Sequence, residues 1–184
     1  ADFVYTVQPG DHSWNLAERY LKNPSLAQAL LRLNHIADDR RILPGTQLRI
    51  PNGWLKLESS QVTLLAVTGD TTLHQGDTPA RAAVAGVLLQ APSGIRTGAD
   101  GSATLQFADG TRVMVLRDSE LQLQSSQKSV LGGVSTMALS LLRGHVENQV
   151  TPKGNSGGRF EIRTPAAIAA VRGTQYRVSV DGKT

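Results

Sequence analysis

The sequence contains no cysteine, which excludes both a disulfide framework and a metal site built from thiolates. It also has no apolar run approaching the ~20 residues that a helix needs to cross a bilayer. Aromatic residues make up only 4% of the chain, whereas glycine occurs 18 times. Few aromatics and many glycines predict tight turns between short strands rather than long helices.

Enzyme signatures are also missing. The histidines are scattered, with no pair four residues apart and no HExxH motif, so a zinc site is not expected. No pair of acidic residues suits glycoside hydrolysis, and no glycine-rich phosphate loop follows a strand. Ser119 lacks a His or Asp partner at nucleophile spacing and is interpreted as a turn residue. We therefore expect no enzyme activity, no cofactor and no metal.

The net charge of +4 favours anionic surroundings such as cell wall, nucleic acid or lipid headgroups. However, basic and acidic residues alternate along the chain. Asp38 and Asp39 directly precede Arg40 and Arg41, and no run of Lys or Arg exceeds two residues. A nucleic-acid site needs a concentrated basic patch. We interpret the charge as solvation, and expect no nucleic-acid partner and no membrane insertion within this chain.

Residues 1–52 follow the order strand, helix, helix, strand. Alternation over 3–8 predicts the first strand, and 47–50 predicts the second. Asn23 and Pro24 separate the two helices, because Asn caps a helix and Pro suits its first position. We expect both helices to lie on one face of a two-stranded antiparallel sheet, in an α+β unit with βααβ order.

The corner between this first strand and first helix, Pro9-Gly10-Asp11, allows two interpretations. Gly10 can simply turn the chain, with Asp11 as the helix N-cap, because a carboxylate accepts hydrogen bonds from the free amides of a first turn. The same corner can instead present unpaired backbone amides to a ligand. Trp14 and Ala17 are expected on the buried face of the helix.

From Trp54 onward, helical periodicity almost vanishes and short alternating runs are separated by Gly and Asp turns. Asp109-Gly110 signals a two-residue hairpin, because both central positions favour a left-handed backbone. The stretch 130–144 is ambiguous, and its glycines and Thr136 favour strand over helix. The regular turn spacing predicts an all-β domain, either an antiparallel sandwich or a rolled, solenoid-like fold, whose final strand ends at Val180.

Four segments of the first region, YTVQPGD, WNLAERY, LLRLNHI and ILPGTQLRIP, resemble the LysM domain. The resemblance implies binding of N-acetylglucosamine polymers, peptidoglycan or chitin, in a shallow groove between the loop after strand one and the loop before strand two. His12 and Ser13 stand where the family usually has Thr-Leu, so an apolar floor residue is lost and a bulky ring is added. The glycan-binding residues implied are Gly10, Asp11, His12, Ser13, Asn34, Ile36, Ile42, Leu43 and Pro44.

The second region resembles the FecR-type domain of periplasmic regulators of iron-transport signalling and of other envelope proteins. The segments GIRTGADGSATLQFADGTRVMVLRDSELQL, LLRGHVENQV and FEIRTPAAIAAVRGTQYRVSV carry the resemblance. Within the last of these, Arg172, Gly173 and Thr174 are either an internal structural clamp or a contact with a partner protein.

Together these features predict a LysM module at 1–52, a linker at 53–61, a FecR-type domain at 62–180 and a tail at 181–184, beyond which the chain is expected to continue. Trp54 is expected to pack against one of the domains. The main hypothesis is a non-enzymatic protein of the Gram-negative periplasm or cell envelope that binds peptidoglycan. Its β-domain would then serve as a protein-interaction or scaffolding element, with envelope proteins as possible partners. The alternatives are a regulator in trans-envelope signalling and the targeting part of a larger cell-wall protein.

Overall fold

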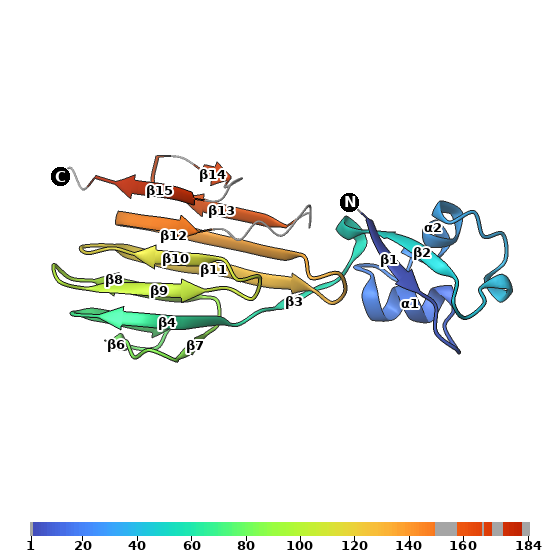
Figure 1. Ribbon diagram of the computed structural model, residues 1–184, viewed down its shortest axis with the longest axis horizontal. Helices are drawn as coiled ribbons and strands as arrows, with labels where there is room; N and C mark the ends of the chain where they lie inside the picture. The colour runs from blue at the N-terminus through green and yellow to red at the C-terminus, as the bar shows by residue number, and fades with distance from the viewer. Residues whose placement is uncertain (1, 150–157, 167, 171–174, 182–184) are drawn as a thin grey trace. The chain divides into compact units, whose positions relative to one another are not determined.

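The computed structural model describes residues 2–149, 158–166, 168–170 and 175–181, and the chain divides into two compact units (Figure 1). Of the described residues, the first unit holds 2–58 and 129–134. The second unit holds the others. The units therefore combine two short helices in one part with a large, curled and mainly antiparallel sheet in the other.

The first unit is built on a two-stranded antiparallel sheet in which Val4 pairs with Arg49. Both strands are short because a Pro-Gly pair stands at each end of the segment that connects them. The elements of this unit are β1 (Asp2–Thr6), α1 (Ser13–Tyr20), α2 (Leu26–Leu33), η1 (Asp39–Arg41), β2 (Gln47–Pro51) and η2 (Asn52–Trp54), followed by β3 (Leu57–Ser59) at its boundary.

The core of the first unit forms where α1 and α2 bury their apolar faces together with residues of β2. Leu16, Leu30 and Ile50 are almost completely buried there, and each buried side chain of this size contributes about 1.5–3 kcal/mol. Trp54 packs against this core, as predicted, and Leu55 belongs to it. The residues directly after β2 are therefore part of the first folded unit.

The second helix begins later than its predicted start at Asn23 and Pro24. Its first residue is Leu26, and Ser25 occupies the N-cap position without a side-chain cap bond. Asn23 still acts locally, because its side chain accepts a 2.9 Å hydrogen bond from the Ser25 amide. The Pro24 carbonyl accepts from the Ala27 amide at 3.1 Å. Asn23 and Pro24 thus form a turn that leads into the helix.

The second unit consists of strands that follow one another through short turns, as the sequence predicted. Its strands are β4 (Val62–Thr68), β5 (Thr71–Gln75), β6 (Arg81–Ala82), β7 (Leu88–Leu89), β8 (Ser93–Thr97), β9 (Ser102–Gln106), β10 (Arg112–Val115), β11 (Glu120–Ser129), β12 (Ser135–Gln149), β13 (Arg159–Arg163), β14 (Ile168–Ala170) and β15 (Gln175–Val180). The ambiguous stretch is a strand from Ser135 onward, whereas 130–134 form the turn before it. The final strand ends at Val180 as predicted.

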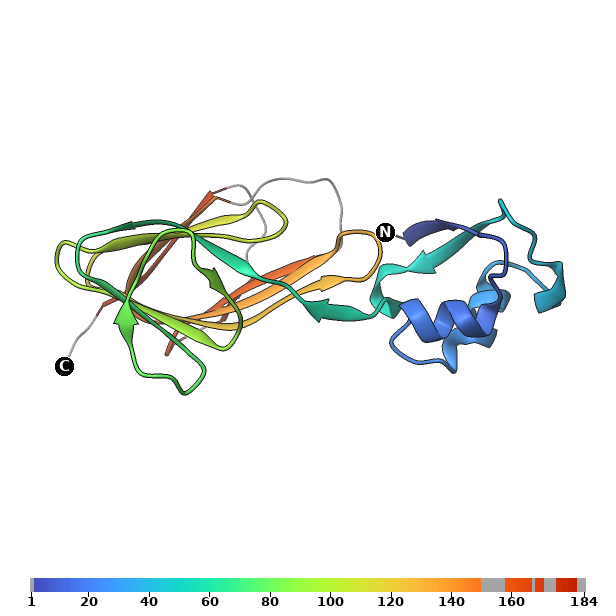
Figure 2. The same ribbon diagram turned by 90° about the horizontal axis from the view of Figure 1, so that it is seen from below.

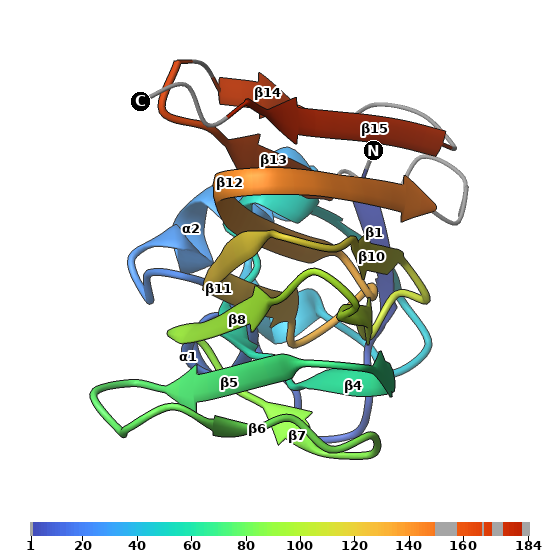
Figure 3. The same cartoon turned by 90° about the vertical axis from the view of Figure 1, so that its left-hand side faces the viewer.

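These strands form a curled sheet in the order β6-β5-β8-β11-β12-β10-β9-β4-β7, and β15 also pairs with β12 (Figures 2 and 3). The curl encloses one apolar core, in which Leu64, Leu105 and Leu139 are fully buried. One pairing differs from the antiparallel expectation, because β13 lies parallel to β12.

β12 bends sharply in the middle and thereby takes part in two stretches of sheet (Figure 3). Up to Arg143 it pairs with β11, and from Val146 it pairs with β10. Gly144 between these stretches has φ +90°. A Cβ there would lie 2.2 Å from the Ser119 Oγ. Both the backbone conformation and the close approach therefore require glycine.

The hairpin between β9 and β10 differs from its prediction. Phe107 and Thr111 face each other, since the Phe107 amide donates to the Thr111 carbonyl at 2.9 Å. Three residues lie between them, and of these only Gly110 has a positive φ, at +87°. The predicted two-residue turn is thus wrong, and the loop has the form of a turn followed by a glycine bulge.

Candidate functional site

The corner that precedes α1 begins at Gly10, which has φ +87°. No atom lies within 4 Å of the position that a Cβ would take there. Glycine is therefore needed for the backbone conformation and not for a close contact. The carbonyl of Gly10 accepts a 3.0 Å hydrogen bond from the Asn15 side chain, which ties the corner to the helix.

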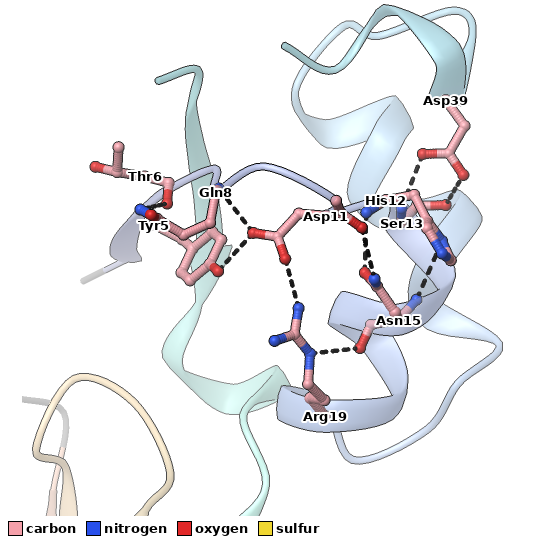
Figure 4. A network of polar contacts seen from close by, with 10 residues as sticks. Tyr5, Thr6, Gln8, Asp11, His12, Ser13, Asn15, Arg19 and Asp39 are labelled. Carbon is pink, nitrogen blue, oxygen red and sulfur yellow. Dashed lines mark hydrogen bonds and ion pairs between the residues drawn. The ribbon is translucent and has the colours of Figure 1, made fainter. Parts of the chain in front are cut away.

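Asp11 is turned inward and holds the corner to β1 and α1 (Figure 4). Its carboxylate accepts from the Tyr5 hydroxyl at 2.7 Å, the Gln8 amide at 2.8 Å and the Arg19 guanidinium at 2.5 Å. Its side chain is only 4% exposed. Burial raises the pKa of the Asp11 carboxyl, but these three donors outweigh it and hold the pKa below its usual value. Asp11 is therefore an anionic clasp inside the fold.

The helix N-cap is His12, so the prediction of Asp11 as the cap is wrong. The Asn15 amide donates to His12 Nδ1 at 3.4 Å, and the His12 amide donates to Asn15 Oδ1 at 2.9 Å. This reciprocal pair satisfies two amides of the first turn. Asp11 does not serve these amides, because its carboxylate accepts from Tyr5, Gln8 and Arg19 instead.

Ser13 joins the first loop to the segment before β2, at Asp39 (Figure 4). Its amide donates to Asp39 Oδ1 at 2.8 Å and its hydroxyl donates to Asp39 Oδ2 at 2.7 Å. Ser13 is completely buried. A polar residue thus occupies a core-facing helical position because a carboxylate from a distant loop satisfies it.

These bonds correct the expectation that the corner presents free amides. The amides of His12 and Ser13 donate to Asn15 and Asp39, and the Asp11 amide donates to the Gln8 carbonyl at 3.1 Å. All three donors are therefore satisfied inside the protein. A ligand at this corner has to be held by other groups.

The second predicted wall, 42–44, leads into a turn that is anchored to the first strand. The Gly45 amide donates to the Val7 carbonyl at 2.8 Å. Ile42 is buried in the core and only 7% exposed, and Ile36 packs partly against the same core. Leu43 instead points outward, with 66% of its surface exposed, and Pro44 is also exposed.

Asn34 is a structural clamp between α2 and β2. Its amide nitrogen donates to the carbonyls of Leu30 at 2.9 Å and Arg49 at 3.0 Å. Its oxygen accepts from the Arg49 amide at 2.7 Å. The side chain is therefore engaged at both ends, and its role is to position the loop that follows α2.

Two residues of this region were missed by the sequence reasoning. Asp39 was interpreted as part of a solvated charge run, and no local pattern links it to Ser13. Trp14 was placed on the buried face of α1, but it is 54% exposed. The buried positions of that helix are Ser13, Leu16 and Ala17, which turns Trp14 toward solvent.

In the second unit, Ser119 is a structural residue, in agreement with its interpretation as a turn residue. It is fully buried, its hydroxyl lies 3.0 Å from the Arg117 carbonyl, and it accepts from the His145 amide at 2.9 Å. These contacts hold the bend of β12. The predicted clamp or partner contact at Arg172, Gly173 and Thr174 lies outside the described residues.

The second unit also carries a hollow of about 520 Å³. It combines exposed apolar side chains, Leu65 and Met114, with the ion pair between Arg177 and Glu147. Arg112 also lines it and makes no ion pair among the described residues. None of the predicted glycan-binding residues of the first unit lines this hollow.

Comparison with family models identifies both parts of the chain. The model described as FecR protein matches residues 93–184, half of the 184 residues. The chain belongs to the FecR family. The LysM domain model matches residues 5–51, so this FecR-family chain carries an N-terminal LysM domain, which confirms both resemblances. No curated protein and no solved structure matches the chain.

The two families limit the function in general terms. LysM domains point to binding of glycans that contain N-acetylglucosamine, and FecR domains point to signalling in the cell envelope. Neither family is catalytic. Among the helices in the described part of this FecR-family chain, none is long and apolar enough to cross a bilayer.

Proposed function

We propose that this FecR-family chain is a non-enzymatic protein of the Gram-negative periplasm that holds peptidoglycan through its LysM domain. The match of residues 5–51 to that domain carries the proposal. The contacts between Ser13 and Asp39 support it, because they connect the two loops between which the glycan would lie. The module would then anchor the FecR-type part to the cell wall.

The groups that contact the sugar are the exposed ones. An N-acetylglucosamine unit offers a flat apolar face and an acetyl methyl, together with polar amide and hydroxyl groups. Leu43 and Pro44 supply an exposed apolar surface for the methyl. The His12 imidazole and the Trp14 indole supply exposed rings. Asp11, Ser13, Asn34 and Ile42 keep the loops that carry these groups in place.

The affinity of one such module for a short oligomer is expected to be weak. The exposed residues cover little surface, and sugar hydroxyls must be stripped of water to bind. Retention on the cell wall then comes from the repeating polymer, on which a released module rebinds at a neighbouring unit.

Binding to insoluble peptidoglycan tests the proposal. The full chain should sediment with purified sacculi, and titration with N-acetylglucosamine oligomers should shift amide signals at 10–14 and 42–45. The binding-site variant is Leu43→Asp, which places a charge on the apolar surface without touching the core and should therefore weaken binding. A wild-type chain that stays in the supernatant and shows no shifts contradicts glycan binding.

A role in trans-envelope signalling is the second candidate, and the FecR match at 93–184 favours it. We propose that the FecR-type domain begins near residue 62, where β4 starts, and contacts another envelope protein. Such a regulator needs a membrane helix and a cytoplasmic segment in its gene product. Fractionation of cells that express the complete gene product tests this: a regulator should remain with the inner membrane after salt and alkaline washes.

A further inference from the structure

Arg40 and Arg41 lie in the loop before β2 of the LysM domain, between two residues whose side chains are held in place. On one side, the Asp39 carboxylate accepts hydrogen bonds from the Ser13 amide at 2.8 Å and hydroxyl at 2.7 Å. On the other side, the Ile42 side chain is buried in the core. Arg40 and Arg41 are the only residues between these anchors. They therefore lie next to the contact that joins the two loops.

The backbone of this segment is held in one turn of 3-10 helix, η1. The Arg40 amide donates to Asp38 Oδ1 at 3.0 Å, and the Arg41 amide donates to the Asp38 carbonyl at 2.9 Å. The Ile42 amide donates to the Asp39 carbonyl at 3.2 Å. Both arginine side chains are nevertheless exposed. The backbone at both arginines is thus fixed, and their side chains extend into solvent.

The charges of these arginines are available to a ligand. Neither Arg40 nor Arg41 makes an ion pair with any residue in the described part of the chain. The carboxylate of Asp39 is taken by Ser13. The carboxylate of Asp38 accepts from a backbone amide. A guanidinium presents a planar set of donors that suits a carboxylate in bidentate geometry.

We infer that Arg40 and Arg41 bind the carboxylates of peptidoglycan stem peptides, so that the LysM domain prefers peptidoglycan to uncharged glycans of the same sugar. This inference rests on the glycan binding proposed above. Stem peptides branch from the muramic acid next to each N-acetylglucosamine unit and carry free carboxylates. Chitin oligomers carry the same acetylated sugar without any charge. The two arginines therefore distinguish ligands that the sugar-contacting groups treat alike.

The test compares three soluble probes on the full chain: an N-acetylglucosamine hexamer, peptidoglycan fragments with free stem carboxylates, and the same fragments after amidation of those carboxylates. The variant is the double substitution Arg40→Gln and Arg41→Gln. Since an exposed ion pair changes an equilibrium about two- to fivefold, the double variant should bind the free-carboxylate fragments about four- to twenty-fivefold more weakly. Its affinity for the hexamer and the amidated fragments should equal that of the wild type.

Lys22→Gln is the matched control. Lys22 is an exposed cation of the same unit, but it follows the other end of α1, about 12 Å along the helix from Ser13. This substitution should leave all three affinities unchanged. The difference between wild type and the double variant should also shrink as salt rises, because exposed charges are screened. Equal thermal midpoints show that the variants are folded.

Each remaining outcome counts against a distinct statement. Wild-type affinity of the double variant for the free-carboxylate fragments overturns the inference, as does an equal loss for the hexamer, which would assign the arginines to the sugar site itself. A wild-type chain that binds none of the three probes overturns the glycan-binding proposal, and the inference falls with it. If the wild-type chain binds all three probes and amidation of the carboxylates does not change the affinity, the inference is overturned while the glycan-binding proposal stands.

Discussion

The Ser13 hydroxyl donates a 2.7 Å hydrogen bond to the carboxylate of Asp39, a residue 26 positions further along the chain. The bond joins the first turn of α1 to the 3-10 turn η1, and a second bond from the Ser13 amide reinforces it at 2.8 Å. Because Ser13 is buried, water cannot replace these contacts cheaply. The distance between the two loops of the LysM domain is therefore set by this pair.

Ser13→Ala should destabilise the first unit by about 1–3 kcal/mol, because Asp39 loses one of its two donors at a partly buried site. Both tryptophans of the chain, Trp14 and Trp54, lie in the first unit, so urea unfolding followed by tryptophan fluorescence reports this unit alone. Asp38→Asn is the control, and its exposed side chain should change stability by less than about 0.5 kcal/mol. Equal effects of the two substitutions would contradict the role of the Ser13 contact.

The Asp11 clasp predicts that acid destabilises the first unit. The folded pKa of Asp11 lies below its usual value, so its contribution is fully present above the unfolded pKa of about 4. That contribution is lost as pH falls through the lower folded pKa. In Asp11→Asn, the fluorescence-detected stability should be lower at neutral pH and should fall less on acidification. The prediction fails if wild type and variant lose stability in parallel.

Gly144→Ala should destabilise the second unit by about 3 kcal/mol. The substitution combines an unfavourable φ of +90° with a Cβ placed 2.2 Å from the Ser119 Oγ, and left-handed strain and overpacking each cost about 1–3 kcal/mol. Gly86→Ala is the matched control, because Gly86 has φ +92° with no atom within 4 Å of a Cβ. It should cost only about 1–2 kcal/mol. Circular dichroism of the sheet during thermal unfolding measures both, and equal losses would show that the contact with Ser119 adds nothing.

Trp14→Ala should weaken binding of N-acetylglucosamine oligomers about tenfold, which corresponds to ~1.4 kcal/mol. The indole is 54% exposed, so its removal takes away a binding surface at little cost to the core. Titration by calorimetry measures the affinity. Trp14→Phe serves as the control, since it keeps an aromatic ring and should retain most of the affinity. Unchanged binding by Trp14→Ala would exclude the indole from the glycan site.

Local patterns were sufficient for much of the first unit. Pro and Gly at each end of the connecting segments, and the apolar spacing of the helices, predicted two strands and two helices close to their observed bounds. The corner was harder, because Asp11 has a good local role as an N-cap. In the folded chain that carboxylate accepts hydrogen bonds from Tyr5 and Arg19 instead, and His12 caps the helix.

In the second unit, alternation predicted the strands but not all of their partners. A two-residue period shows which side chains face the core, and it does not state which strand lies beside which. The parallel pairing of β12 with β13 and the bend at Gly144 both depend on contacts between distant segments. The prediction of a two-residue turn at Asp109-Gly110 was wrong for a local reason, because only Gly110 of this pair has a left-handed backbone.

By itself, the sequence determined that the chain holds a LysM domain and belongs to the FecR family, because these follow from residue types at fixed local spacing. It also predicted the two helices and two strands of the first unit and an all-β second region. Only the tertiary structure showed which hydrogen bonds Asp11, Ser13 and Asn34 make within the protein, and that Trp14 faces solvent. The physical reason is that a polar group takes the best partner within reach, and partners such as Asp39 come within reach only when the chain has folded.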